Sequence, residues 1–416
     1  MKRILAVSAL AVLAGCTATV SQPQTQPPAN IDVIKTYFNG NNAFVYTRDA
    51  QNTTGAAAIV SLVEPFKVLK TGIGEASWFS NDVILQSDSR YTYIIDRTNG
   101  NITVVDPLDN GKELKQVSVG PTSNPKSVVR IGDKLYVSRW NSADVLVLDA
   151  NTYAQLGTIS LSKYADADNL PEMGLAVTAE GKVWLLLERY DQSTWTPSTQ
   201  PTDKAYMIGI DPKTDTIANE VALLGKTPYQ ILKTDPLSGN LYLISASGSG
   251  AGIEMVNPKT GTSAGWLVDP SVFPTGSNPD SPISFAAATT TTVFVVVPEG
   301  FQGWTLYDWD FTVLYAIDRK TGSKTEVLRS SEGYMGLACL ELSPGTTRNP
   351  GERLLVTCEG PGARVTQPGL RIFDSSTLKE LTSKPLDTGL PPFGVTFFAR
   401  PETAVVSVPA TTATQP

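Results

Sequence analysis

The sequence has no histidine among its 416 residues. Without an imidazole side chain it cannot build a Ser-His-Asp or Cys-His nucleophilic system, a His-ligated zinc or copper site, or a haem held by histidine. The Asp-x-Asp-x-Asp-Gly spacing of calcium-binding loops is also missing. We therefore expect a protein that has no catalytic residues, no metal ion and no cofactor.

Long hydrophobic runs are missing too, apart from a single short one at the start of the chain. Lys2 and Arg3 precede an apolar stretch over residues 4–13, which is too short to span a bilayer comfortably. Small residues follow this stretch. The order of properties therefore predicts a signal peptide over residues 1–15.

The tetrapeptide Leu13-Ala14-Gly15-Cys16 resembles the lipobox of bacterial lipoproteins. That resemblance implies that the thiol of Cys16 carries a diacylglyceryl group, which anchors the chain in a membrane without a transmembrane helix. Thr17 follows, where inner-membrane lipoproteins of Gram-negative bacteria usually carry Asp. The resemblance thus implies the outer membrane of the cell envelope, on its periplasmic or its surface side. The alternative is an ordinary secretory peptide with an incidental cysteine.

The amino-acid composition divides the rest of the chain into a tether, one domain and a short tail. Residues 16–30 are rich in Thr, Gln and Pro and predict a flexible tether after the lipidated cysteine, and residues 411–416 predict a disordered tail. Between them, residues 31–410 are expected to form one domain. The formal net charge of -7 is spread along the chain, so nucleic acid is not an expected partner. We favour a monomer.

Cysteine is scarce, with three residues in the whole chain. Apart from Cys16, Cys339 and Cys358 lie in two apolar runs joined by a Gly/Pro-rich connection, as in neighbouring strands. An exported protein meets an oxidising compartment, so we expect a disulfide between Cys339 and Cys358. Two buried free thiols are the alternative.

Internal repetition is the most informative feature of the sequence. An apolar strand that ends in Asp or Asn and continues into a polar turn recurs at intervals of roughly fifty residues, ending at Asp106, Asp149, Asp211, Asn257, Asp318 and Asp374. Out of phase with it, a strand, a tight turn and a very apolar strand recur, for example over residues 126–137 and 174–185. These elements resemble the YVTN-type β-propeller repeat.

The resemblance implies an all-β protein, a β-propeller of four-stranded blades. Counting the apolar strands that open each unit gives seven blades, with eight as the alternative. A further strand over residues 403–408 is expected to close the ring. The opening strands begin near Phe44, Tyr91, Leu135, Val183, Leu241, Val293 and Leu354.

The connections of such a propeller divide between two faces. If strands are lettered a to d from the opening strand, the long, aromatic-rich connections are nearly all a–b or c–d, which share one face. Long loops often carry function, so we expect binding there. Alternatively, the aromatic rings pack the loops onto the blades. The candidate binding residues are Arg139, Trp140, Tyr190, Trp195, Trp304, Tyr307 and Trp309.

Residues just before each d strand form a second candidate set, because they are expected near the mouth of the central channel. They could converge on a ligand, or they could fill the channel through water-mediated contacts. The predicted channel-mouth residues are Lys126, Glu172, Tyr229, Tyr334 and Phe393.

These features predict a membrane-anchored, non-enzymatic binding module. It could capture a small ring-bearing ligand for uptake, as lipoproteins of similar architecture do for corrinoids, or bind an envelope protein, as the propeller lipoprotein of the outer-membrane barrel insertion machinery does. The alternative is a lactonase-like, divalent-metal-dependent hydrolase, in which calcium would be held by acids of the same face. The candidate acids are Glu172, Glu188, Asp191, Glu299, Asp308 and Glu332.

Overall fold

A computed structural model of the chain describes most of the predicted domain. It covers residues 40–49, 53–74, 78–109, 111–166, 168–191, 196–197, 204–247, 250–273, 283–299, 311–330, 336–344, 354–359 and 368–398. The predicted signal peptide, Cys16, the tether and the tail lie outside these residues. In the described part, no helix is long and apolar enough to cross a bilayer.

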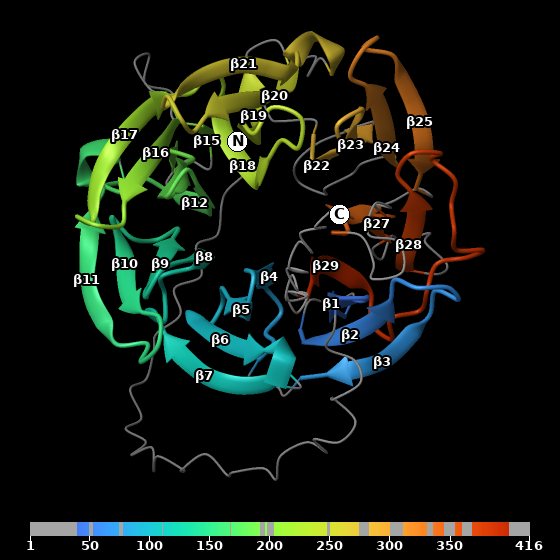
Figure 1. Cartoon of the computed structure of the whole chain (residues 1–416), viewed down its shortest axis with the longest axis horizontal. Helices are drawn as coiled ribbons and strands as arrows, with labels where there is room; N and C mark the ends of the chain where they lie inside the picture. Colours follow the sequence, from blue (N-terminus) through green and yellow to red (C-terminus); the bar gives the residue numbers. More distant parts are fainter. Residues whose placement is uncertain are drawn as a thin grey trace, which may run out of the picture.

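Seven antiparallel sheets surround a central axis, and each sheet is one blade (Figure 1). The chain is therefore a seven-bladed β-propeller, as predicted, and the eight-bladed alternative is wrong. From the axis outward, blade 1 contains β29 (Pro392–Phe397), β1 (Asn42–Arg48), β2 (Gly55–Ser61) and β3 (Val68–Ile73). Blade 2 contains β4 (Val83–Ser87), β5 (Thr92–Asp96), β6 (Asn101–Asp106) and β7 (Lys112–Ser118). Blade 3 contains β8 (Pro125–Ile131), β9 (Lys134–Arg139), β10 (Asp144–Asp149) and β11 (Gln155–Ser160).

The remaining blades follow the same order. Blade 4 contains β12 (Met173–Ala179), β13 (Lys182–Leu187), β16 (Tyr206–Asp211) and β17 (Thr216–Ala222), and a small hairpin of β14 (Tyr190–Asp191) and β15 (Thr196–Pro197) extends from it. Blade 5 contains β18 (Lys226–Thr234), β19 (Leu241–Ser247), β20 (Gly250–Asn257) and β21 (Thr262–Val268). Blade 6 contains β22 (Phe285–Ala288), β23 (Thr292–Glu299), β24 (Phe311–Asp318) and β25 (Lys324–Arg329).

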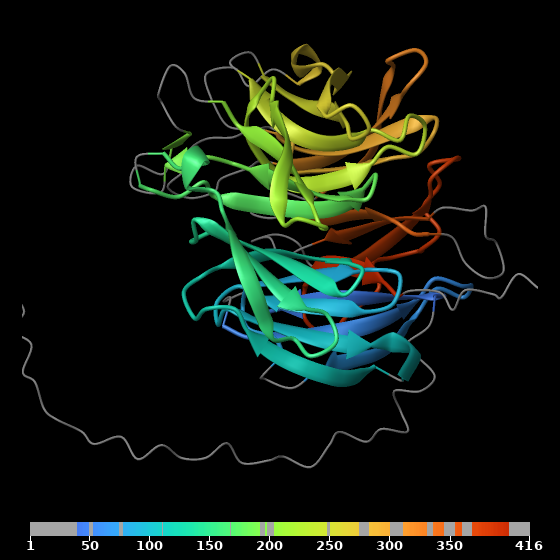
Figure 2. The same ribbon diagram turned by 60° about the vertical axis from the view of Figure 1, so that its left-hand side comes forward.

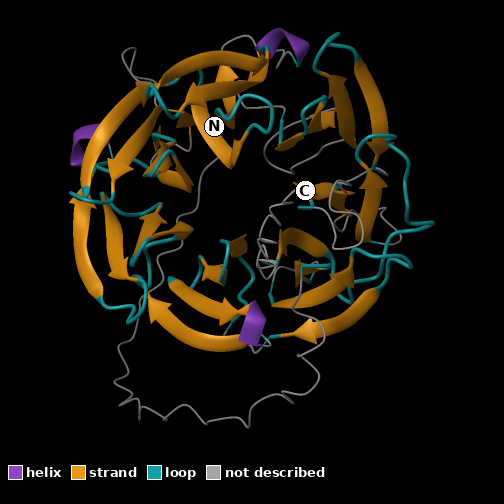
Figure 3. Cartoon of the chain, in the orientation of Figure 1, coloured by secondary structure: helices purple, strands orange, loops and turns teal. Residues whose placement is uncertain are grey.

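Blade 7 contains β26 (Leu337–Leu342), β27 (Leu354–Glu359) and β28 (Gly369–Asp374). Its fourth position is taken by an irregular segment that forms two isolated bridges, Leu370 with Leu386 and Phe373 with Glu380. Outside the sheets the described helices are three short 3-10 turns at the periphery, η1 (Pro107–Asp109), η2 (Ser162–Tyr164) and η3 (Pro270–Val272) (Figure 3).

The middle strands of each blade are buried on both sides, which explains their continuous apolar sequence. In β13, five of the six residues of Lys182–Leu187 are buried, whereas the outer strand β17 is largely exposed. The blades lie face against face around the axis (Figure 2). Hydrophobic clusters fill the spaces between neighbouring blades, for example between blades 3 and 4 and between blades 5 and 6. The core is thus divided among the blade interfaces.

The C-terminal part of the propeller closes the ring by joining the first blade. β29 pairs antiparallel with β1, with Val45 opposite Val395. The predicted closing strand over residues 403–408 is therefore not needed for closure, and it lies outside the described residues. Joining the two ends of the chain in one blade removes an open sheet edge.

The sequence-based choice of the strand that opens each blade was wrong by one strand. The strands near Phe44, Tyr91 and their equivalents are the second strands of the blades, and the innermost strands precede them. Innermost strands border the channel and carry polar side chains such as Gln86 and Ser127. The most apolar strand therefore marks the most buried position in a blade, which is one step away from the axis.

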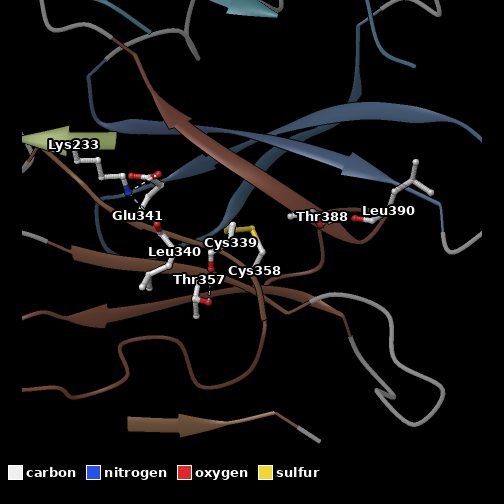
Figure 4. Close-up of a disulfide and its surroundings, with 8 residues drawn as sticks. All are labelled: Lys233, Cys339, Leu340, Glu341, Thr357, Cys358, Thr388 and Leu390. Atoms are coloured by element: carbon white, nitrogen blue, oxygen red, sulfur yellow. Dashed lines mark hydrogen bonds and ion pairs between the residues drawn. A yellow bond between two sulfur atoms is a disulfide. The ribbon is translucent and has the colours of Figure 1, made fainter. Parts of the chain in front are cut away.

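The predicted disulfide is confirmed. Cys339 and Cys358 lie directly opposite each other in β26 and β27, with Sγ atoms 2.07 Å apart and Cα atoms 4.9 Å apart (Figure 4). The bridge is buried and joins the innermost strand of blade 7 to the second strand. It ties together the blade whose fourth strand is irregular.

Candidate functional site

The two faces of the ring differ in their connections. We call the face with the a–b and c–d connections, now lettered from the innermost strand, the turn face; residues 132–133 and 150–154 are examples. The opposite face, with the b–c connections and the links between blades, is the loop face; residues 97–100 and 119–124 are examples. The loop face is the one to which sequence analysis assigned binding, because only the strand letters have shifted.

At the mouth of the channel on the loop face, a lysine lies on an indole ring. Lys126 is the second residue of the innermost strand β8, and Trp140 directly follows β9 of the same blade. The Nζ atom of Lys126 is 4.2 Å from the centre of the Trp140 ring. The backbone N–H of Trp140 donates to the carbonyl of Asn124 (2.9 Å), which holds the backbone of Trp140 beside the start of β8. Lys126 is a predicted channel-mouth residue and Trp140 a predicted binding residue of the loops, and the structure brings them into contact.

A buried carboxylate faces this lysine from the next blade. Glu188 directly follows β13 and is 8% exposed. A Cβ atom on Gly174, in the innermost strand β12, would lie 2.7 Å from Oε1 of Glu188. The absence of a side chain at Gly174 therefore leaves the space that the carboxylate of Glu188 occupies.

Burial raises the pKa of Glu188 and lowers the pKa of Lys126, so that both values lie closer to pH 7 than usual. It raises the pKa of Glu188 to about 7, against the attraction of Lys126 and Arg97. It lowers the pKa of Lys126 to about 8, with Glu188 acting in the opposite direction and Arg97 in the same direction. Among the described residues, no hydrogen bond or ion pair is made by the ammonium of Lys126 or the carboxylate of Glu188. They interact through space without direct contact.

The other charges around this pair have partners. Arg97 donates from Nη1 to Asp82 and from Nε to the side-chain oxygen of Asn124, both at 2.9 Å. Arg139, a predicted binding residue, is held by Asp144 (2.5 Å) and by a backbone carbonyl. Arg139 therefore anchors loops.

A second cation lies on an aromatic ring at the mouth. Phe393 is the second residue of the innermost strand β29, as Lys126 is of β8, and the Cζ atom of Arg48 is 3.7 Å from the centre of its ring. Arg48 also donates to the carbonyl of Asn81 (3.2 Å). The predicted channel-mouth residues Lys126 and Phe393 thus occupy equivalent positions on two innermost strands.

Three acids gather beside the loop that leads into β12. Oxygen atoms of Asp166, Asp168 and Glu172 lie within 4.8 Å of one another, and Glu172 is fully buried. Burial raises the pKa of Asp166, and the nearby Asp168 adds to the effect. Clustered carboxylate oxygens are the donors that calcium and magnesium prefer, although calcium usually takes six to eight of them. Of these three acids, only Glu172 is among the residues predicted from the sequence.

The turn-face end of the channel is crossed by an ion pair. Lys233 of β18 reaches Glu341 of β26, with Nζ 2.9 Å from Oε1, and passes β22 between them (Figure 4). It also donates to the carbonyls of Ala286 (3.3 Å) and Leu340 (3.4 Å). This lysine ties three innermost strands together.

The remaining candidate residues divide into two groups. Tyr190, Asp191, Tyr229 and Glu299 lie in β14, β14, β18 and β23, where the structure describes the backbone alone. Trp195, Trp304, Tyr307, Asp308, Trp309, Glu332 and Tyr334 lie outside the described residues.

A cavity of about 660 Å³ lies away from these groups, between the β2–β3 connection and the irregular edge of blade 7. Its lining includes Pro65, Phe66 and Leu386, and it contains no buried charge among the described residues. Charged groups that could bind a ligand, such as Lys126 and Glu188, lie at the loop-face mouth of the channel. This mouth is therefore the stronger candidate site.

Comparison with known proteins supports the fold. No protein-family model and no curated protein matches the sequence. A protein from Lactobacillus plantarum is similar in structure, with 13% identity, a TM-score of 0.57, and coverage of 86% of this chain and 99% of that one. A Bacteroides uniformis protein described as a "putative 6-phosphogluconolactonase" has 11% identity and a TM-score of 0.55, over 86% of this chain and 98% of that one. At these identities the likeness shows the propeller fold alone.

Proposed function

We propose that this chain is a lipid-anchored binding protein of the bacterial cell envelope that captures a small polar ligand at the loop-face mouth of its propeller. The observation that carries the proposal is the pair of the half-buried Lys126 and the buried Glu188, neither of which has a direct partner among the described residues. Taking charges out of water is costly unless they are paired. A ligand that supplies the missing partners would offset this cost.

The geometry supports a small ligand over an envelope protein. Lys126 lies at the start of the innermost strand β8, and Glu188, which follows the second strand β13, is recessed against Gly174. Protein interfaces instead rely on central, exposed aromatic and arginine side chains. At the described part of the mouth, the face of the Trp140 ring is in contact with Lys126 and the face of the Phe393 ring is in contact with Arg48. These faces are therefore already occupied by cations of the protein itself.

The binding proposal can be tested with protein purified from its own envelope and analysed by native mass spectrometry. We expect a small molecule to accompany the wild type and to be lost from Lys126→Met. Lys163→Met is the matched control, because Lys163 is exposed and pairs with Glu220 on the outside of the ring. If the wild type carries no small molecule, or if Lys126→Met retains it in full, the proposal fails.

The proposed attachment to the membrane is based on the lipobox-like residues and can be tested separately. Cys16→Ser should move the protein from the membrane fraction to the soluble fraction, because it removes the lipidated thiol. Fractionation followed by immunoblotting measures this. Persistent tight attachment would show that something other than the lipid holds the chain.

A divalent-metal-dependent, lactonase-like hydrolase is the second candidate, and the cluster of Asp166, Asp168 and Glu172 is the observation that favours it. If calcium binds there, it should raise the melting temperature of the wild type and not that of Glu172→Gln. Lactone hydrolysis that depends on calcium and is lost in that variant would replace the binding proposal. No calcium response would remove this candidate.

A further inference from the structure

Among the described residues at the mouth on the loop face, the cation Lys126 and the anion Glu188 lack direct partners, and we infer that the ligand of this mouth is a small zwitterion such as a free α-amino acid. This inference rests on the proposed function and specifies its ligand. It concerns only the pair Lys126 and Glu188, which come from the two neighbouring blades 3 and 4.

Lys126 supplies the half of the site that would hold a carboxylate. Its ammonium lies over the Trp140 ring, which attracts a cation from one side. An ammonium also has three N–H donors, and no described residue accepts a hydrogen bond from it. Arg97, a cation whose charge acts on Lys126, already has Asp82 and Asn124 as partners. A ligand carboxylate is the group that Lys126 lacks.

Glu188 supplies the opposite half. Its carboxylate is recessed against the backbone of Gly174, where any larger residue would displace it. A buried carboxylate accepts hydrogen bonds only, and no described residue donates one to it. A ligand ammonium would supply both the donors and the opposite charge.

The two halves together exclude ligands of a single charge. An anion bound at Lys126 would face the carboxylate of Glu188, and a cation bound at Glu188 would face the ammonium of Lys126. Like charges held together in a partly dry site repel each other. A molecule with adjacent ammonium and carboxylate groups satisfies both residues and adds no net charge.

The test uses amino acids and derivatives that each lack one charge. The twenty free L-amino acids are screened by thermal shift against the wild type, and the best binder is measured by calorimetry. Its amide, which lacks the carboxylate, and its N-acetyl form, which lacks the ammonium, are measured beside it. We expect each derivative to bind at least about thirtyfold more weakly, since truncating one partner of a buried charge pair has effects of this size.

Two variants connect each charge to its residue. Lys126→Met should bind the amide about as well as the parent amino acid, and Glu188→Gln should bind the N-acetyl form about as well as the parent. Lys163→Met should keep the wild-type preferences. Melting temperatures establish that all variants are folded. Lys126→Met, which keeps Glu188, should still bind the N-acetyl form weakly, and Glu188→Gln, which keeps Lys126, should still bind the amide weakly.

The outcomes separate this inference from the proposed function. If a derivative with one charge binds as tightly as its parent, or if Lys126→Met still rejects the amide, the zwitterion inference is overturned. It is also overturned if no amino acid binds. In those cases a different small molecule recovered by native mass spectrometry leaves the proposed function standing, whereas recovery of none removes both.

Discussion

The turn face and the loop face of this propeller are built from the same repeat, yet they treat charge differently. On the turn face, Arg319 and Asp235 form a buried ion pair at 2.5 Å between blades 6 and 5, and Lys134 pairs with Asp215 at 2.6 Å between blades 3 and 4. On the loop face, Lys126 and Glu188 of neighbouring blades also attract each other, but they form no ion pair. Paired charges connect blades, whereas the unpaired ones leave groups available for a ligand.

Turn-face acids also fix their own turns. The carboxylate of Asp318 accepts hydrogen bonds from the backbone N–H groups of Lys320 (2.9 Å) and Thr321 (2.7 Å), and Asp149 and Asp374 do the same in their blades. This is the physical role of the acid that ends each repeat. No such repeated role applies to Lys126 or Glu188, which supports a specific purpose for them.

The largest effect is expected from breaking a turn-face pair. Arg319→Met should lower the free energy of unfolding by about 3–5 kcal/mol, because Asp235 is fully buried and would lose its cation. Urea unfolding measures the loss. Arg329→Met in the same blade is the control and should cost at most about 1 kcal/mol, since its pair with Glu326 is exposed. Equal losses in the two variants would contradict the structural role assigned to Arg319.

On the loop face, removing charges is expected to increase the free energy of unfolding instead of lowering it. The double variant Lys126→Met/Glu188→Gln should raise the free energy of unfolding by about 1–3 kcal/mol near pH 7.5, because it removes one half-buried and one buried charge that have no direct partner among the described residues. Urea unfolding at several pH values measures the change. A destabilised double variant would mean that the pair serves the fold.

The pH dependence of that gain follows from the two pKa values. The raised pKa of Glu188 destabilises the fold increasingly as pH rises from 4.5 to about 7, and the lowered pKa of Lys126 does so as pH falls from 10.5 to about 8. Both costs are present between pH 7 and 8. The gain of the double variant should therefore be greatest in that interval and smaller at pH 5 and at pH 10. A gain that is independent of pH would contradict these shifts.

A smaller effect is expected from filling the space beside Glu188. Gly174→Ala should weaken ligand binding by about tenfold, because the added Cβ would lie 2.7 Å from the carboxylate and must displace it. Gly157→Ala in β11 is the control, since nothing lies within 4 Å of its added Cβ. Calorimetry with the tightest-binding amino acid of the proposed screen measures both affinities. Unchanged affinity in Gly174→Ala would remove Glu188 from the site.

Much of the architecture could be predicted because it is local and repeated. The Asp and Asn residues from Asp106 to Asp374 marked the third strand of six blades, and the runs around Cys339 and Cys358 indicated adjacent strands. The candidate site was predicted less completely. Lys126 and Trp140 were recognised separately, and Arg97 and Gly174 were missed, because neither has a distinctive sequence neighbourhood.

The sequence by itself determined the all-β class, the number of blades, the cysteine pair and the side of the ring with the long connections. Those properties depend on apolar periodicity and turn residues within about fifty residues of one another. Only the tertiary structure decided that β29 closes the ring and that Lys126, Trp140 and Glu188 meet at one mouth. The reason is physical: such contacts depend on how separate blades pack around the axis, and no spacing along the chain encodes the distance between them.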